Sequence, residues 1–153
     1  MGETTIRIEE HIAAPPERVW ATITDTRRYA EWVVNTLEVT YSDSDVADAG
    51  VRYEERNRIA GPLTGSSRWV VSSVDPGRAT VHTGDGIWLA GTMTLDMTVE
   101  PDGAGTRYVH VFTYEPGLGP LGPVVDLGLR PSIGRDMRAS VRRLRELCER
   151  EAG

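Results

Sequence analysis

The sequence predicts an α+β protein in which a curved antiparallel sheet of about seven strands wraps around a long C-terminal helix, with two short helices after the first strand. Two observations lead to this prediction. Polar and apolar residues alternate in a series of segments joined by short turns, and apolar residues near the C-terminus recur at helical spacing. The 153 residues are 39% hydrophobic and 26% charged, which fits one globular domain over residues 1–153.

The first strand is expected over residues 4–12, where one side is apolar and the other polar. Pro15 and Pro16 follow, and proline suits the start of a helix but not a strand interior, so a short helix is predicted over residues 16–24. Asp25 can cap a second short helix. The apolar residues that define these elements are Ile6, Ile8, Ile12, Val19, Trp20, Ile23, Tyr29 and Trp32.

From residue 37 onward the chain reads as a series of strands. They are expected over residues 37–43, 51–59, 66–74, 79–83, 88–99 and 106–115. The segment AGPLTG interrupts the series, and the turns DPGR, GDG and PDGAG carry Gly, Pro and Asp where tight turns need them. Strands joined by such short turns are antiparallel neighbours.

A helix closes the chain, because its apolar residues fall at spacings of four, four, three and three. This stripe consists of Ile133, Met137, Val141, Leu144 and Leu147. The preceding segment, GLGPLGPVVDLGLRP, is either a loop or an irregular first part of the same helix that Pro131 ends or kinks. A meandering sheet of this size curls, so the helix should cover its concave face, with a gap between the two.

The order of these elements resembles the START-like, or SRPBCC helix-grip, superfamily, which includes polyketide cyclase/dehydrase-type and Bet v 1-like proteins. The segments that carry the resemblance are IEEHIAAPPERVWATITDTRRYAEWV, TMTLDMTVEPDGAGTRYVHVFTYE and VRRLRELCE. The resemblance covers nearly the whole chain and is specific for the fold. It implies an internal cavity open to small apolar molecules. It does not select among functions, because the superfamily holds cyclases, lipid carriers and hormone receptors.

The concave face of the last strand would then line the cavity with Tyr108, His110, Phe112 and Tyr114. The alternative is that these rings fill a core. Tyrosine hydroxyls and an imidazole need partners when they are buried, which favours a cavity lining.

Glu55 is the second candidate of chemical interest. The alternate positions Arg52, Glu54, Arg56 and Arg58 are all charged, so that face lies in water and Glu55 points inward. If Glu55 met His110 across the cavity, the two would form an acid/base pair suited to enolisation or dehydration. The alternative is that Glu55 lies near the strand end and reaches solvent.

We therefore predict His110 and Glu55 as catalytic residues. The predicted ligand-binding residues are Tyr53, Asn57, Trp69, Trp88, Met93, Leu95, Tyr108, Phe112, Tyr114 and Met137. Trp69 is assigned to the cavity because it shares a face with Val71, and Arg68 would replace it if the parity were reversed. Trp88 and Trp32 are expected at the rim, and Trp20 in the core.

Other functional classes find little support. GLGPLG matches a dinucleotide-binding pattern, but Pro120 lacks the N–H that a pyrophosphate needs, so no cofactor is predicted. His11, His82, His110 and Cys148 are too scattered for a metal site. A net charge of −6 argues against nucleic acid. The arginines at 135, 138, 142 and 145 form either a solvated face or a site for an acidic partner.

The expected location is the cytoplasm, since the chain shows a single cysteine, no secretory signal and no apolar run of membrane-spanning length. All 17 basic residues are arginine, a bias that points to a GC-rich bacterial source. Two functions fit: a polyketide cyclase or dehydratase, and a non-catalytic carrier, sequestering or accessory protein that uses the same cavity. The oligomeric state is not predicted.

Overall fold

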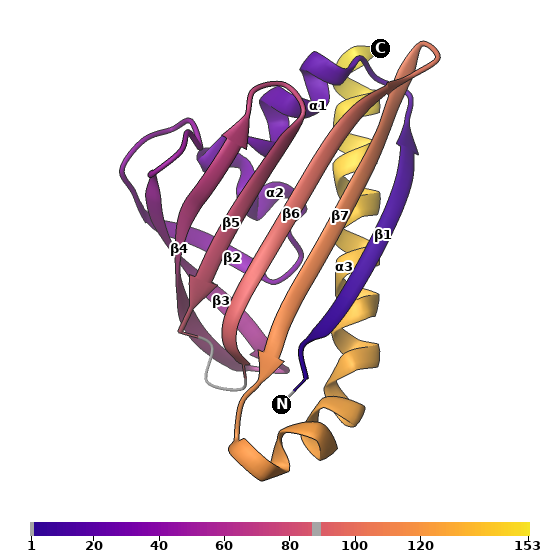
Figure 1. The fold of residues 1–153 in the computed structure, drawn as a ribbon. Helices are drawn as coiled ribbons and strands as arrows, with labels where there is room; N and C mark the ends of the chain where they lie inside the picture. The colour runs from indigo at the N-terminus through magenta and orange to yellow at the C-terminus, as the bar shows by residue number, and fades with distance from the viewer. Residues whose placement is uncertain (1, 87–89) are drawn as a thin grey trace.

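A seven-stranded antiparallel sheet, two short helices and one long helix make up the fold, as predicted (Figure 1). The computed structural model describes residues 2–86 and 90–153. The strands are β1 (Thr4–Ile12), β2 (Thr36–Ser42), β3 (Arg52–Ala60), β4 (Leu63–Asp75), β5 (Ala79–Asp85), β6 (Ala90–Asp102) and β7 (Gly105–Pro116). The helices are α1 (Pro16–Ile23), α2 (Tyr29–Trp32) and α3 (Gly122–Ala152), with 3-10 turns η1 (Thr26–Arg28) and η2 (Gly119–Leu121).

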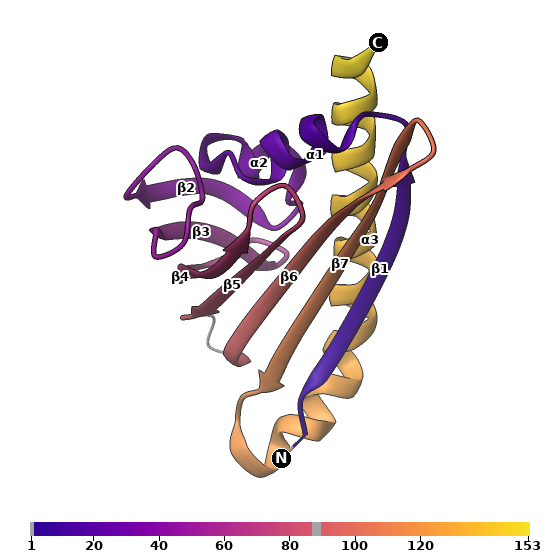
Figure 2. The same cartoon turned by 45° about the horizontal axis from the view of Figure 1, so that its top comes forward.

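The strand order is β1-β7-β6-β5-β4-β3-β2, so consecutive strands pair from β2 to β7 and β1 joins the far edge. The sheet curves around one side of α3, while α1 and α2 lie across one end of the curve (Figures 1 and 2). The segment AGPLTG, expected to interrupt the strands, contributes its last three residues to β4, which begins at Leu63. The Asp25 carboxylate accepts a hydrogen bond from the backbone N–H of Arg27 and so caps the 3-10 turn η1, which leads into α2; α2 itself begins after Arg28 without a side-chain cap.

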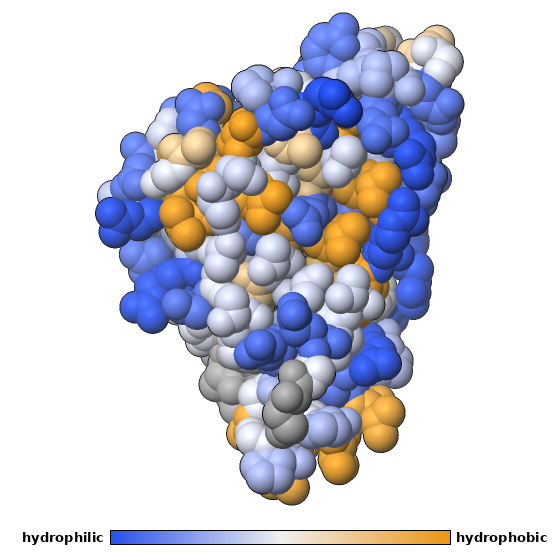
Figure 3. Space-filling view, in the orientation of Figure 1, coloured by the Kyte–Doolittle hydropathy of each residue, from blue (hydrophilic) through white to orange (hydrophobic). Residues whose placement is uncertain are grey.

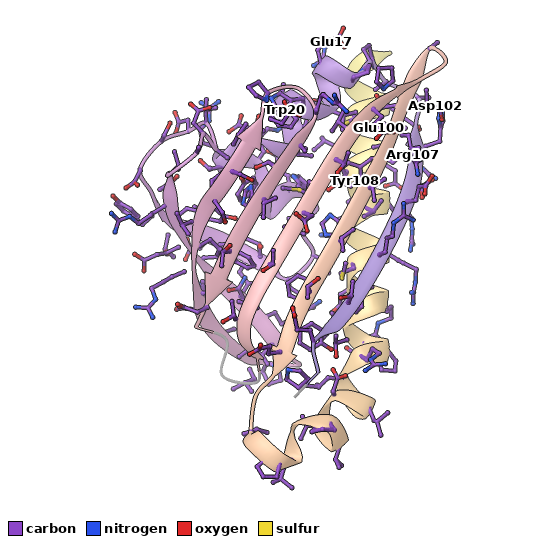
Figure 4. The ribbon with its side chains drawn as sticks, viewed as in Figure 1. Glu17, Trp20, Glu100, Asp102, Arg107 and Tyr108 are labelled. Carbon is purple, nitrogen blue, oxygen red and sulfur yellow. The ribbon has the colours of Figure 1, made fainter. Side chains whose placement is uncertain are left out.

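The outer face of the sheet carries ion pairs near β1 and β7. The Arg107 guanidinium donates to the carboxylates of Glu9 on β1 and Glu100 on β6 (Figure 4). Figure 3 shows hydrophilic residues along the right edge of this face, hydrophobic residues scattered among polar ones over its upper part, and further hydrophobic residues at the lower end, where α3 begins. The exposed large hydrophobic residues at that end are Leu118, Leu121, Val124 and Leu127. In the parts of the chain that the structure describes, no helix has the length and apolar character needed to cross a membrane.

The core lies between α3 and the strands β1, β6 and β7. The predicted helix stripe faces it, and Val141 and Leu144 are fully buried. Tyr108 belongs to this core and does not line the cavity, so that prediction is wrong. Its ring belongs to the same core cluster as Val141, Leu144 and Leu147 of the helix stripe. Trp20 packs against the same core as a partly buried residue.

The segment before Pro131 is helical, which decides between the two alternatives for it. GLGPLG connects β7 to α3 through η2, and α3 then continues through Pro131. Asp126 fixes this first part of the helix to the sheet, because its carboxylate accepts hydrogen bonds from Thr4, Tyr114 and Arg130. Tyr114 is therefore a helix anchor rather than a cavity residue, contrary to the prediction.

Among the predicted arginine stripe, Arg145 pairs with Glu10 at 3.1 Å and Arg135 lies 3.7 Å from Asp136. Arg138 and Arg142 are exposed. These positions agree with the solvated-face alternative.

Candidate functional site

A cavity of about 140 Å³ lies between the concave face of the sheet, α2 and α3. It is lined by nine of the twelve residues predicted for the site: Tyr53, Glu55, Asn57, Trp69, Met93, Leu95, His110, Phe112 and Met137. Tyr108 and Tyr114 are the two corrected above, and Trp88 lies outside the described residues. The lining residues that the site prediction missed are Tyr29, Trp32, Val33, Asn35, Thr36, His82, Met97, Ile133, Asp136 and Ser140.

The face of β4 that carries Trp69 lines the cavity, as expected. Trp69 pairs with Tyr53 of β3 and stacks on its ring, with centroids 6.3 Å apart, while the side chain of Arg68 is 71% exposed. Trp32 was expected at the rim, but it is only 1% exposed and forms part of the wall next to the core. The helix position brings its indole under the sheet instead of leaving it at the opening.

One wall of the cavity is a continuous hydrogen-bonded network, which we call the paired wall and define as Thr36, Glu55, Asn57, Ser67 and Trp69. The Trp69 indole N–H donates to the Ser67 hydroxyl at 2.8 Å, and this hydroxyl donates to Oδ1 of Asn57 at 2.6 Å. The Asn57 amide and the Thr36 hydroxyl donate to the two carboxyl oxygens of Glu55, at 3.4 and 3.0 Å. The β3–β4 register places Glu55 opposite Ser67, which makes the network possible.

Glu55 is buried, which excludes the alternative that it reaches solvent at a strand end. It is 6% exposed. Burial raises the pKa of its carboxyl group, and the hydrogen bonds from Thr36 and Asn57 oppose part of that rise. A raised pKa makes the ionised carboxylate a stronger base and lets the carboxyl group stay protonated to a higher pH. Glu55 is therefore suited to proton transfer.

A tyrosine–histidine pair stands beside the paired wall. The Tyr53 hydroxyl is 2.6 Å from Nδ1 of His82, and Nε2 of His82 is 3.1 Å from the Thr80 hydroxyl. Burial lowers the pKa of His82 to about 4, so its ring is neutral at pH 7. The sequence signal for His82 was the alternation of residues 79–83, which puts it on the same face as Thr80.

A second pair joins His110 to Tyr108, whose hydroxyl is 2.7 Å from Nδ1 of His110. Burial, and then the nearby His82, lower the pKa of His110 to about 4. The hydroxyl of Tyr108 has no other partner among the described residues, so we assign it as the donor to Nδ1. The ring proton is then on Nε2, and His110 offers an N–H donor to a molecule in the cavity.

Glu55 and His110 line the same cavity, but no hydrogen bond joins them within the described part of the chain. A direct acid/base pair is therefore absent in this geometry. A bound molecule placed between the two could still contact both groups.

A second part of the lining, from α2 and the segment that follows it, has polar groups without partners, and we call it the unpaired wall: Tyr29, Trp32 and Asn35. Among the described residues, the buried side-chain atoms that lack a hydrogen-bond partner are the Tyr29 hydroxyl, Nε1 of Trp32 and Oδ1 of Asn35. All three residues line the cavity. Native structures contain few such atoms, and each calls for an explanation.

No group of three His, Cys, Asp or Glu side chains that could hold a metal ion occurs in residues 2–86 and 90–153. The single cysteine, Cys148, is buried in the core.

The family model for "polyketide cyclase / dehydrase and lipid transport" proteins matches residues 3–149. The chain belongs to this family, within the SRPBCC superfamily that its element order resembled, and has the helix-grip fold of a hydrophobic-ligand-binding protein. None of the curated proteins compared with the chain matches its sequence.

Solved structures of low sequence identity share this fold. The Zhui aromatase/cyclase from Streptomyces sp. R1128 is 19% identical, with a TM-score of 0.81 over 99% of this chain and 97% of that chain. Protein CV1439 from Chromobacterium violaceum is 20% identical, with a TM-score of 0.73 over 95% and 97%. The protein Ara h 8.0201 is 10% identical, with a TM-score of 0.71 over 96% and 98%.

Proposed function

We propose that the chain binds an aromatic or polyketide-like small molecule in this cavity and catalyses its cyclisation or dehydration. The observation that carries the proposal is the composition of the cavity: aliphatic and aromatic side chains surround a small number of buried polar groups. Such a lining is typical of small-molecule sites, where apolar surface supplies affinity and a few polar atoms fix orientation. The aromatase/cyclase among the structural neighbours supports the reaction class by analogy.

The proposed chemistry divides between two residues. The Nε2–H of His110 donates a hydrogen bond to a ketone oxygen and stabilises the enolate that forms there. Glu55, in its ionised form, takes a proton from the adjacent carbon and returns it to a departing hydroxyl group, so that one water leaves and one C=C bond forms. In this proposal Tyr53, which lines the cavity and is hydrogen-bonded to His82, orients the same substrate.

Substitutions at these two positions test the proposal. We expect a β-hydroxyketone incubated with the wild-type protein to yield a product lighter by one water in mass spectrometry, and His110→Gln and Glu55→Gln each to reduce that rate at least about hundredfold. Glu54→Gln, on the exposed face of the same strand, is the matched control and should not change it. Unchanged turnover in both cavity variants would remove the assigned roles.

A non-catalytic carrier is the second candidate, and the paired wall favours it, because both oxygens of Glu55 are already bonded to the protein. Saturable binding with recovery of the unchanged molecule across all substrates tried would support the carrier over the enzyme.

A further inference from the structure

The side chains of the cavity that carry charge at pH 7 are acidic. Glu55 and Asp136 are the carboxyl groups among the described lining residues, and the imidazoles of His82 and His110 beside them are neutral. All 17 basic residues of the chain are arginine, and none of them is among the described residues that line the cavity. The cavity therefore offers no cation to a carboxylate or a phosphate, and its potential favours positive groups.

Asp136 is the carboxylate that is free to bind a molecule in the cavity. Its side chain lines the cavity from α3 and is 22% exposed, so it carries a negative charge at pH 7. Both oxygens of Glu55 are bonded within the paired wall. The hydrogen bond that Asp136 accepts from the Ser140 hydroxyl goes to its backbone oxygen instead, and no described residue donates a hydrogen bond to its carboxylate.

One arginine adjoins Asp136 without forming a hydrogen bond to it. Nε of Arg135 lies 3.7 Å from Oδ1 of Asp136, which is longer than a hydrogen bond. The Arg135 side chain is 73% exposed and donates to the Ser132 hydroxyl. Exposed ion pairs of this kind contribute little, because water screens them. The Asp136 carboxylate therefore remains available to a ligand.

Aromatic rings and the size of the cavity set the rest of the ligand. Tyr53, stacked with Trp69, and Phe112 are among the rings of the lining, which bind apolar surface and also attract a cation to their faces. A volume of about 140 Å³ is close to that of cavities that hold a single benzene ring. A molecule that covers Asp136 takes its carboxylate out of water, and a positive group offsets that cost whereas a neutral group does not.

We infer that the cavity selects an arylalkylamine, a molecule with an aromatic ring among the aromatic side chains and a protonated amino group paired with Asp136. The inference rests on the proposed function, because it requires a small molecule in this cavity, and it adds the charge of that molecule. The amino group is separate from the ketone that His110 contacts in the proposed reaction. Carboxylates of the same size bind more weakly, since they bring a like charge to Asp136.

Calorimetric titration with three probes of similar shape tests the inference. 2-Phenylethylamine, 2-phenylethanol and 3-phenylpropanoate share a ring and a two-carbon chain and end in a positive, a neutral and a negative group. At pH 7 and low salt we expect the amine to bind wild-type protein at least about tenfold more tightly than the alcohol, and the carboxylate to bind more weakly than both.

A matched pair of substitutions on α3 assigns the effect to one carboxylate. Asp136→Asn should weaken binding of the amine about tenfold and change binding of the alcohol less than about twofold. Glu146→Gln removes the same charge from an exposed position of the same helix and should change binding of the amine less than about twofold.

The outcomes separate the two proposals. Equal binding of the amine and the alcohol, tighter binding of the carboxylate, or amine binding that Asp136→Asn leaves unchanged would each overturn the inference while small-molecule binding stands. If none of the three probes binds, the inference is overturned, and the dehydration assay described above decides on the proposed function by itself.

Discussion

The paired and unpaired walls face the same cavity and consist of similar residue types, yet the fold uses their hydrogen-bonding groups differently. Asn57 is bonded at both its carbonyl oxygen and its amide, whereas Oδ1 of Asn35 has no partner in the described structure. Trp69 donates to Ser67, whereas Trp32 donates to no described residue. The hydrogen bonds of the paired wall thus contribute to stability, whereas the unpaired wall leaves three buried polar atoms without partners among the described residues.

The largest expected effect concerns the pH dependence of stability, and it involves the two imidazoles that line the cavity, His82 and His110. Their pKa values are lowered to about 4 in the folded protein, while an unfolded chain has about 6.5. Between these values the unfolded chain binds protons that the folded chain does not, so the free energy of unfolding should fall as the pH drops from 6.5 toward 4. The loss should reach about 1–3 kcal/mol for each imidazole in urea titrations at successive pH values.

Two variants sharpen this measurement. His110→Gln removes one of the titrating rings and should make the pH dependence shallower. Glu55 acts in the opposite direction: its raised pKa contributes stability below about 4.5 that is lost as the pH rises through the folded value, so Glu55→Gln should make the dependence steeper. An identical pH profile in all three proteins would contradict the assignment of neutral, buried imidazoles.

A matched pair of asparagine substitutions compares the walls directly. Asn57→Ala removes two hydrogen bonds and leaves Ser67 and Glu55 with unsatisfied groups, so the free energy of unfolding should fall by about 2–3 kcal/mol. Asn35→Ala removes an atom without a partner, and the change should stay within about 0.5 kcal/mol. Equal losses from both substitutions, measured by urea denaturation, would show that the walls do not differ.

The smallest effects come from removing single hydroxyl groups. Ser67→Ala breaks the link between Trp69 and Asn57 and should cost about 1–2 kcal/mol. Tyr29→Phe deletes an unpartnered buried hydroxyl and should leave stability unchanged or raise it by up to about 1 kcal/mol. Differential scanning calorimetry compares the two, and a clear drop in Tm for Tyr29→Phe would indicate a partner for this hydroxyl within the protein.

Strand parity was predictable from the sequence because neighbouring side chains point to opposite faces. The charged positions from Arg52 to Arg58 assign Glu55 and Asn57 to the concave face, and both line the cavity. The same rule placed His110 and Phe112. Two of the lining residues that the prediction missed, Tyr29 and Asn35, lie in a short helix and its connection to β2, where no alternation indicates which side chains reach a cavity.

The sequence by itself determined the order of the elements, the inward face of each strand assigned above and the apolar stripe of the last helix. Only the tertiary structure decided how far along β7 the cavity extends. Tyr108, His110, Phe112 and Tyr114 share one face, but α3 packs on Tyr108 at one end and Asp126 bonds Tyr114 at the other. The two-residue period of a strand gives the direction in which a side chain points. What packs on that side chain depends on where a helix remote in sequence crosses the strand.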